Sequence, residues 1–331
     1  MPKKFLYILI LLMVINSVLF AASKRPEWIS DPYSQYPASN YLCAVGTGKE
    51  LKSAQNDALK NIAGFFETRV TAVTKSMESE TTSASGSEIN SSISTSVKAI
   101  SEGTIKFTEI KETYQDPNTN NFYALAVLNK KALLALYEKE IVESEDFIAN
   151  CLFKVEDPLL RFAKLCQAID KYYATQNAFV YYNALAGESG SFLRPACSLQ
   201  ELKEMRSEAA QDIPFCIIVK GDSSASLEAS LLNVFNQMGL NNLVEESKAE
   251  FRIYALLTPQ PQKTIGKQFY QPFSLKIHFL RGDKLLFSFV DKTEQGGSSP
   301  EEAISRGIKV LAKNIETKFN KEFTNYLSQM E

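Results

Sequence analysis

The 331-residue sequence is poor in histidine, and its single one, His278, restricts the chemistry that the protein can perform. A Ser/His/Asp or Cys/His catalytic site needs a histidine beside a nucleophile, and no serine or cysteine around His278 lies in a nucleophile motif. On its predicted strand, His278 alternates with apolar positions and shares the polar face with Lys276. We therefore expect a solvated side chain, and a metal site built from several histidines is excluded.

The sequence also lacks an excess of positive charge. Its 36 Lys and Arg residues stand against 38 Asp and Glu residues, which gives a formal net charge of −2, and no run of Lys or Arg exceeds two residues. Nucleic-acid-binding proteins carry basic patches, so we expect no nucleic-acid partner. The hydrophobic share of 45% is instead typical of a globular protein.

The cysteines include no C-x-x-C pair, which argues against zinc and thioredoxin-like sites. They are Cys43, Cys151, Cys166, Cys197 and Cys216. The odd number leaves at least one thiol unpaired, and each cysteine lies in or beside an apolar run. We predict that they serve as small buried hydrophobic residues. Paired carboxylates stay open as a catalytic alternative, because two such partners need not be close in sequence.

A long apolar run opens the sequence. Two lysines precede an almost wholly apolar stretch at residues 5–20, and two alanines follow it. This order is typical of a secretory signal, so we predict that residues 1–22 are removed on export, with an uncleaved anchor as the alternative. No cysteine directly follows the apolar stretch, since the first is Cys43, so the usual lipidation site of a bacterial lipoprotein is missing.

The order of the predicted elements indicates an α+β protein with two small sheet-plus-helix domains joined by a helical connector. We place the first domain at residues 23–130, the connector at 131–211 and the second domain at 212–331. The first domain opens with a strand at 41–45. It ends with two β-rich runs around Asp116-Pro117-Asn118, which predict a hairpin.

Apolar side chains recur at helical spacing after the first strand, which predicts a long helix with one buried face. A Ser- and Thr-rich segment follows at 74–104, and it is either a solvated loop or, from the spacing of its apolar residues, a second helix over about 88–102. Trp28, the only tryptophan, is expected to pack on this domain. The predicted buried face of the long helix carries Leu51, Ala54, Ala58, Ile62, Phe65, Val70, Val73 and Met77.

The second domain is predicted to have the order β-α-β-β-β-α. Its first helix is expected to begin with Ser223 or Ser224 as its cap and to stop at Gly239, and its second is expected to begin within residues 298–302. That last helix should be amphipathic. Its apolar face carries Ile304, Ile308, Leu311, Ile315, Phe319 and Phe323.

Two glycine-containing motifs look like binding sites, but both are better explained as turns. In Gly46-Thr47-Gly48, the third glycine of a dinucleotide fingerprint is replaced by Leu51, and Lys49 comes too early for a P-loop. We interpret the motif as a tight corner in which glycine permits unusual backbone angles. Arg281-Gly282-Asp283 spells a cell-adhesion tripeptide, yet it falls where a hairpin needs a two-residue turn.

The N-terminal domain resembles a known family over roughly residues 25–130. Pro26 and Trp28, then a polar proline-rich gap, the run Tyr41–Gly48 and a helix that opens with Ala54 and Ala58 resemble the Lpp20 family of bacterial envelope lipoproteins. The N-terminal domain of the flagellar outer-ring protein FlgT is similar. The resemblance implies that the glycines turn a strand into a packed helix and bind no phosphate. It also implies an outer-membrane-associated protein that is not an enzyme.

Together these patterns predict an exported bacterial cell-envelope protein that is non-enzymatic and that binds or scaffolds other envelope or flagellar proteins. We expect no catalytic, cofactor-binding or metal-ligating residues, a peripheral association with the outer membrane, and oligomers. The alternative is a periplasmic ligand-binding protein or hydrolase with a site between its domains. Buried carboxylates in a deep pocket would favour this alternative, and flat exposed faces would favour a binding protein.

Overall fold

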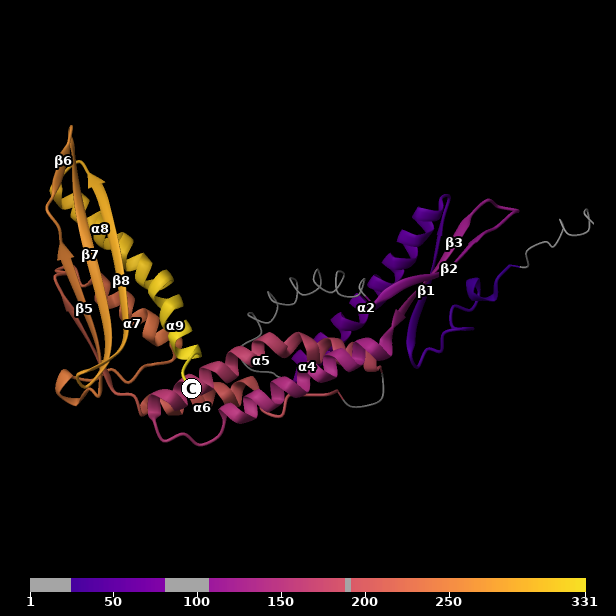
Figure 1. The fold of residues 1–331 in the computed structure, drawn as a ribbon, viewed down its shortest axis with the longest axis horizontal. Helices are drawn as coiled ribbons and strands as arrows, with labels where there is room; N and C mark the ends of the chain where they lie inside the picture. Colours follow the sequence, from indigo (N-terminus) through magenta and orange to yellow (C-terminus); the bar gives the residue numbers. More distant parts are fainter. Residues whose placement is uncertain (1–24, 81–106, 188–191) are drawn as a thin grey trace, which may run out of the picture. The chain divides into compact units, whose positions relative to one another are not determined.

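The computed structural model describes residues 25–80, 107–187 and 192–331 (Figure 1). Two sheet-containing parts of the chain are separated in sequence by a run of helices. The predicted α+β class is therefore confirmed. The predicted signal at 1–22 and the predicted helix over 88–102 lie outside the described residues, as does most of the Ser- and Thr-rich segment.

The chain forms two compact units. Unit 1 comprises Met1–Ile141 and Asn177–Leu193, and unit 2 comprises Val142–Gln176 and Arg194–Glu331. The division falls inside two helices of the expected connector. The separation of the sequence into two domains and a connector stays a prediction, since contacts within a unit do not establish that a segment folds by itself.

Unit 1 is built on a three-stranded antiparallel sheet with the strand order β1-β3-β2. The predicted hairpin is confirmed as β2 and β3. Asp116 stabilises its turn by accepting a hydrogen bond from the backbone N–H of Asn118 at 2.9 Å. The elements are β1 (Tyr41–Gly48), α2 (Leu51–Glu80), β2 (Thr108–Gln115) and β3 (Phe122–Asn129).

Helix α2 packs on the sheet along one stripe of small and then large side chains. The expected face is confirmed at most positions, but Leu51 and Phe65 are exposed and Phe66 is buried in place of Phe65. The side chain of Met77 lies outside the described part of the chain. Steps of four residues, which return to the same side of a helix, lead from Ala54 to Phe66. The buried residues of the stripe are Ala54, Ala58, Ile62, Phe66, Val70 and Val73.

The opposite face of this sheet is covered by the segment that precedes β1. Trp28 lies in a short 3₁₀-helix, Glu27–Ile29, and is buried against Cys43, Leu125 and Val127. Successive residues of a strand point to opposite faces, so Leu125 and Val127 face Trp28 while their neighbours face α2. The expected packing of Trp28 on this part of the chain is confirmed.

Three helices follow β3, where the sequence predicted a helical connector. They are α4 (Lys130–Cys151), α5 (Pro158–Ala186) and α6 (Leu199–Gln211). The carboxylate of Asp157 accepts a hydrogen bond from the N–H of Leu160 at 2.9 Å, which satisfies one of the open donors at the start of α5. Pro158 takes the first helical position, where its missing N–H is harmless.

Unit 2 contains the larger sheet, in which β4, β5, β7 and β8 lie side by side in that order. Strands β4 and β5 are parallel, and the other pairs are antiparallel. The predicted order is confirmed with one addition, the short β6, which pairs with the start of β7. The strands are β4 (Phe215–Lys220), β5 (Phe251–Pro259), β6 (Lys263–Ile265), β7 (Gln268–Arg281) and β8 (Lys284–Gly297).

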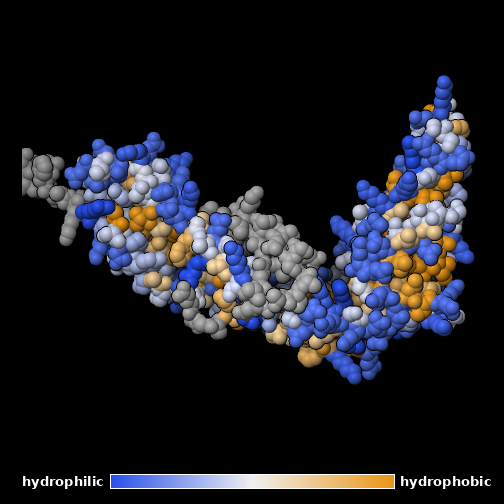
Figure 2. All heavy atoms as spheres, turned by 180° about the vertical axis from the view of Figure 1, so that it is seen from behind, coloured by the Kyte–Doolittle hydropathy of each residue, from blue (hydrophilic) through white to orange (hydrophobic). Residues whose placement is uncertain are grey.

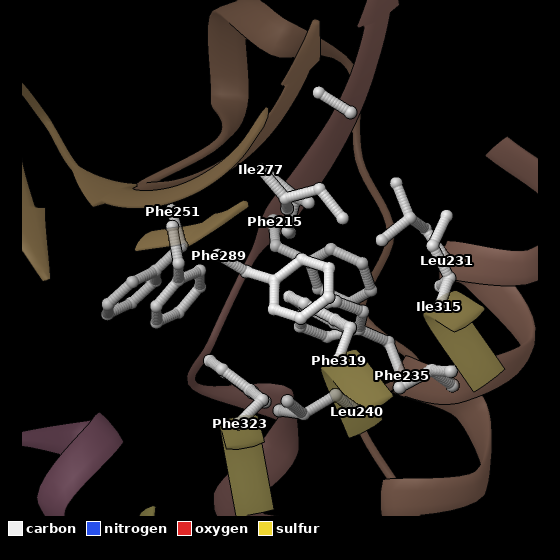
Figure 3. Close-up of a cluster of buried hydrophobic side chains, with 14 of the residues drawn as sticks. Phe215, Leu231, Phe235, Leu240, Phe251, Ile277, Phe289, Ile315, Phe319 and Phe323 are labelled. Atoms are coloured by element: carbon white, nitrogen blue, oxygen red, sulfur yellow. The ribbon is translucent and has the colours of Figure 1, made fainter. Parts of the chain in front are cut away.

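The helices that follow β4 in sequence cover one face of this sheet. They are α7 (Ser226–Met238), α8 (Pro300–Asn314) and α9 (Asn320–Ser328), with a π-helical turn at Ile315–Phe319 between the last two. The core between helices and sheet is rich in phenylalanine (Figure 3). The ring of Phe235 lies 5.3 Å from that of Phe323, and the ring of Phe319 stacks on Phe323 at 5.6 Å.

The helix ends of unit 2 confirm part of the predicted capping. Helix α7 stops at Gly239, with a φ of 91°, as expected for a left-handed cap. At its start Ala225 takes the cap position in place of the expected serine, although the hydroxyl of Ser224 accepts from the N–H of Ser226 at 3.4 Å. The carboxylate of Asp222 accepts from the N–H of Leu227 at 2.9 Å. Helix α8 begins as predicted, since the hydroxyl of Ser299 accepts from the N–H of Glu302.

Candidate functional site

Gly46 and Gly48 lie where β1 passes closest to α2. A Cβ on Gly46 would lie 2.1 Å from the backbone nitrogen of Ala58, and one on Gly48 would lie 2.7 Å from that of Ala54. Both glycines continue the pairing of β1 with β3. Neither has a positive φ, so the expected reason for glycine was wrong. The residues are glycines because the helix backbone leaves no room for a side chain.

The polar groups of this corner are occupied from within the protein. The N–H of Thr47 donates to the carboxylate of Asp57 at 2.9 Å, and the side-chain amide of Asn61 donates to the carbonyl of Val45 at 3.0 Å. In a phosphate-binding loop this N–H would be free to bind a ligand. Here the carboxylate of Asp57 on α2 occupies the N–H of Thr47 instead. This geometry supports the interpretation of the motif as a structural joint.

Burial makes the cysteine thiols inert. All five are free, with Cys43, Cys151 and Cys216 buried and Cys166 and Cys197 partly buried. Burial raises the pKa of Cys43 and of Cys166 to about 11, so both stay protonated and weakly nucleophilic near neutral pH. Their predicted role as small hydrophobic residues fits these positions.

The Arg281-Gly282-Asp283 motif forms the turn between β7 and β8, as predicted. Gly282 has a positive φ of 56°, which glycine adopts without strain. Asp283 is bound by Arg252 at 3.1 Å, and Arg281 points away to carboxylates of Asp157 and Glu250. The tripeptide is thus held by internal ion pairs.

The face of the unit 2 sheet that points away from the helices is the most distinctive surface in the described part of the chain. We call it the outer face. Its side chains form three rows across the paired strands, as the register requires. The rows are Ile218, Tyr254, His278 and Ser288, then Lys220, Leu256, Lys276 and Val290, then Thr258, Ser274 and Lys292. His278 lies beside Lys276 on this polar side of β7, as predicted, and is half-buried.

The outer face exposes large apolar side chains. Leu256 is 37% exposed, Val290 is 52% exposed, and Leu285 at the end of β8 is 50% exposed. Figure 2 shows hydrophobic side chains gathered on the surface of unit 2. Contiguous exposed apolar surface of this kind marks interaction sites more often than scattered residues do.

Lysines accompany these apolar residues without acidic partners. Among the described residues, Lys220, Lys276 and Lys292 have no ion pair, whereas Glu294 is held by Lys263 at 2.8 Å. The carboxylate of Glu294 is therefore neutralised by Lys263, whereas the charges of these three lysines are not. A surface with this pattern attracts an acidic partner.

An open groove of about 640 Å³ runs along one end of the outer face. It is lined by Gln260, Pro272, Phe273, Ser274, Lys276, Val290, Lys292, Thr293 and Glu294. Lys276 and Lys292 line it together with the apolar side chain of Val290. No buried pair of carboxylates lies in it, so its chemistry favours binding over acid–base catalysis.

No group of His, Cys, Asp and Glu that could hold a metal ion occurs in the described ranges. Nor does any helix in those ranges combine the length and the hydropathy of a membrane span. The outer face was not predicted from the sequence, although one signal was available. Leu256 and Val290 stand at positions where the alternation of their strands calls for polar residues.

Several solved structures are similar to the chain in part. The secreted protein HP1454 from Helicobacter pylori is 13% identical with a TM-score of 0.42, over 86% of this chain and 97% of that one. A candidate lipoprotein from Caulobacter crescentus CB15 is 12% identical with a TM-score of 0.27, over 38% of this chain and 97% of its own. A minor lipoprotein from Acinetobacter baumannii is 13% identical with a TM-score of 0.25, over 35% and 92%.

None of the curated proteins matches the chain in sequence. The N-terminal part has a clear relationship nonetheless. The resemblance predicted for that part is confirmed, because residues 26–129 match the LPP20 lipoprotein family.

Proposed function

We propose that the protein is an exported, non-enzymatic component of the bacterial cell envelope that binds another envelope or flagellar protein through the outer face of unit 2. The observation that carries the proposal is the outer face itself. It combines exposed Leu256 and Val290 with three lysines that have no acidic partner, and the helices α7, α8 and α9 all pack on the other side of the sheet.

Export is supported by the start of the sequence and by the family match. Lysines, an apolar stretch and small residues stand in the order of a secretory signal. The match to the LPP20 lipoprotein family over residues 26–129 favours an envelope location. No cysteine directly follows the apolar stretch, so attachment to the outer membrane would not use the usual lipid-bearing cysteine.

The partner is an acidic protein surface with an apolar centre. Exposed apolar side chains supply affinity when water is removed from them, at about 25 cal/mol per Å². Lys220, Lys276 and Lys292 then favour carboxylates around that centre and disfavour basic proteins. The outer face is a pleated sheet surface rather than an amphipathic helix, the usual element that lies in a membrane interface, and this favours a protein over a lipid partner.

Photo-crosslinking in native cells tests the proposal. A crosslinking amino acid placed at Val290, which is 52% exposed, is expected to capture one acidic envelope protein. The same amino acid at Val142 of α4, which is 53% exposed, is the matched control. Replacing Lys276 and Lys292 by glutamate is expected to abolish the Val290 product, because carboxylates would then face carboxylates.

Two results would contradict the proposal. Equal products from Val290 and Val142 would mean that the outer face is an ordinary surface. Lipid adducts at Val290 in place of a protein adduct would assign the face to the membrane instead.

A further inference from the structure

Unit 1 contains a small cavity of about 130 Å³ that is separate from the outer face. A single water needs roughly 10–15 Å³ measured in this way, so the cavity has room for a small ion with its first contacts. Five segments form it: the lead-in to β1, the start of β1, helix α2, the start of α4 and the end of α5. Its lining includes Tyr33, Arg69 and Lys130 as polar side chains and Leu42, Phe66 and Leu185 as apolar walls.

The two cations of the cavity have no counter-ion. No acidic residue lines the cavity. The ammonium of Lys130 donates to the carbonyl of Ala38 at 2.9 Å, and the guanidinium of Arg69 lies 5.6 Å from the centre of the Phe65 ring. Neither has an ion pair among the described residues. Arg281 of unit 2 shows the contrast, because two carboxylates hold it.

The proximity of Arg69 to Lys130 is unfavourable in the empty cavity. Burial, and then the positive charge of Arg69, lower the pKa of Lys130. Two like charges in a partly buried site repel each other, and the repulsion is stronger where apolar walls exclude water. An anion between them would remove this repulsion and gain two charge-assisted hydrogen bonds.

Tyr33, a third possible donor, also lines the cavity. The hydroxyl oxygen of Tyr33 accepts from the N–H of Cys43 at 3.5 Å, so its own proton remains available to an acceptor. A guanidinium, an ammonium and a phenol together can bind three oxygens of one anion. A tetrahedral phosphate offers three such oxygens, whereas a carboxylate offers two.

We propose that the cavity lined by Tyr33, Arg69 and Lys130 binds a phosphate group. The group is either free phosphate or the phosphate of a lipid headgroup, because both present the same oxygens. Arg69 binds two of them side by side with its planar fork, Lys130 contributes a point charge, and Tyr33 donates to the third.

Isothermal titration calorimetry of the full chain tests the site with three probes: inorganic phosphate, glycerol 3-phosphate and acetate. Saturable binding of inorganic phosphate is expected if the natural source is free phosphate, and binding of glycerol 3-phosphate alone is expected if it is a headgroup. Flotation with phosphatidylglycerol vesicles then checks the headgroup source. Arg69→Gln and Lys130→Gln are each expected to weaken binding by at least about tenfold.

Lys131→Gln is the matched control, because Lys131 is the exposed neighbour of Lys130 and does not line the cavity. It is expected to leave the affinity unchanged. Thermal unfolding separates a lost site from a lost fold: phosphate is expected to raise the melting temperature of the wild type but not that of Arg69→Gln. The proposal is overturned if no phosphate probe binds, if acetate binds equally well, or if Lys131→Gln weakens binding as much as Arg69→Gln.

Discussion

Gly46 can lie close to helix α2 because glycine has no Cβ atom. Backbone atoms of Ala54 and Ala58 lie within 2.3 Å of the place where a Cβ on Gly46 would be. Backbone cannot turn aside as a flexible side chain can, so either the strand or the helix would have to move. Gly64 of the same helix is different, because nothing lies within 4 Å of its Cβ position.

Gly46→Ala and Gly64→Ala are therefore expected to change stability in opposite directions. Gly46→Ala should lower the free energy of unfolding by roughly 1–3 kcal/mol or more, as overpacking does. Gly64→Ala should raise it by roughly 0.5–1 kcal/mol, because alanine favours the helix. Urea unfolding followed by circular dichroism measures both. Equal effects of the two substitutions would refute the close-packing account.

Asp157 connects the start of α5 to the end of β7 within unit 2. Burial alone would raise its pKa, but hydrogen bonds from the N–H of Leu160 and from Arg281 outweigh burial and lower the pKa below its ordinary value. A carboxyl with a lowered pKa in the folded state contributes stability above its unfolded pKa of about 3.9. That contribution disappears as the pH falls through the lower, folded-state value.

Asp157→Asn is thus expected to lower the free energy of unfolding at neutral pH. This loss should become smaller as the pH falls below about 4. The side chain is 38% exposed, and solvent screening limits the effect to about 1 kcal/mol or less. Urea unfolding of both proteins between pH 7 and pH 3 provides the comparison. Asp146→Asn, at an exposed carboxylate, controls for the change of net charge. A difference that stays constant over this range would rule out the ion pair as its source.

The last helical segment keeps one apolar stripe in contact with the sheet by changing its pitch. From Leu311 onward, the buried residues recur at every fourth position, through Ile315, Phe319 and Phe323 to Leu327. An α-helix has 3.6 residues per turn, so such a stripe would drift around it. The wider π-helical turn at Ile315–Phe319 offsets the drift. Ile304, at the other end of the expected face, is 38% exposed.

Phe319→Ala and Ile304→Ala are expected to differ sharply in effect for this reason. Phe319 is 1% exposed and contacts four other rings, so its removal should cost roughly 3–5 kcal/mol. Ile304→Ala should change stability by only about 0.5 kcal/mol, as surface substitutions do. Thermal unfolding of the two variants decides between this stripe and the one expected from spacing alone. Comparable losses would support the latter.

The sequence was a good guide to elements and a poor one to contacts between them. Periodicity predicted α2 and the final helix, yet it placed Phe65 inside because either residue of the pair Phe65-Phe66 fits a period near 3.6. The preference for serine at helix starts led to the prediction of a serine cap for α7. The turn before the helix instead places Asp222 close enough to accept from the N–H of Leu227.

Both candidate sites depend on pairings that no single stretch reveals. Leu256 and Val290 share the outer face only because β5 and β8 flank β7 in the right register. Arg69 and Lys130 meet only because α2 packs beside the junction of β3 and α4. Local sequence determines neither of these arrangements, and so neither site was among the predictions.

At the scale of the molecule, the core of unit 2 includes residues that precede its sheet in sequence. Leu159 and Phe162 of α5, and Ala209 and Ala210 of α6, are buried in the same cluster as the phenylalanines of β4, β5 and β7. Gln167 of α5 donates to the carbonyl of Leu327 at 3.1 Å and to that of Met330 at 3.0 Å. The start of α5 is therefore part of this core, although it lies well before residue 212.

These two cores predict which segments of the full chain lose stability when a large side chain is removed from either of them. Phe162 is 0% exposed and Phe66 is 1% exposed, so each alanine substitution should cost roughly 3–5 kcal/mol in its own unit. Hydrogen exchange followed by mass spectrometry is the measurement, because it reports local opening segment by segment. Phe162→Ala should speed exchange in β5 and β7 and leave β1 and β3 protected, and Phe66→Ala should do the reverse. If either substitution speeds exchange equally in both sheets, the two units unfold as one. If Phe162→Ala leaves β5 and β7 unchanged, residues 212–331 hold their sheet without α5, and the domain boundary expected from the sequence is the physical one.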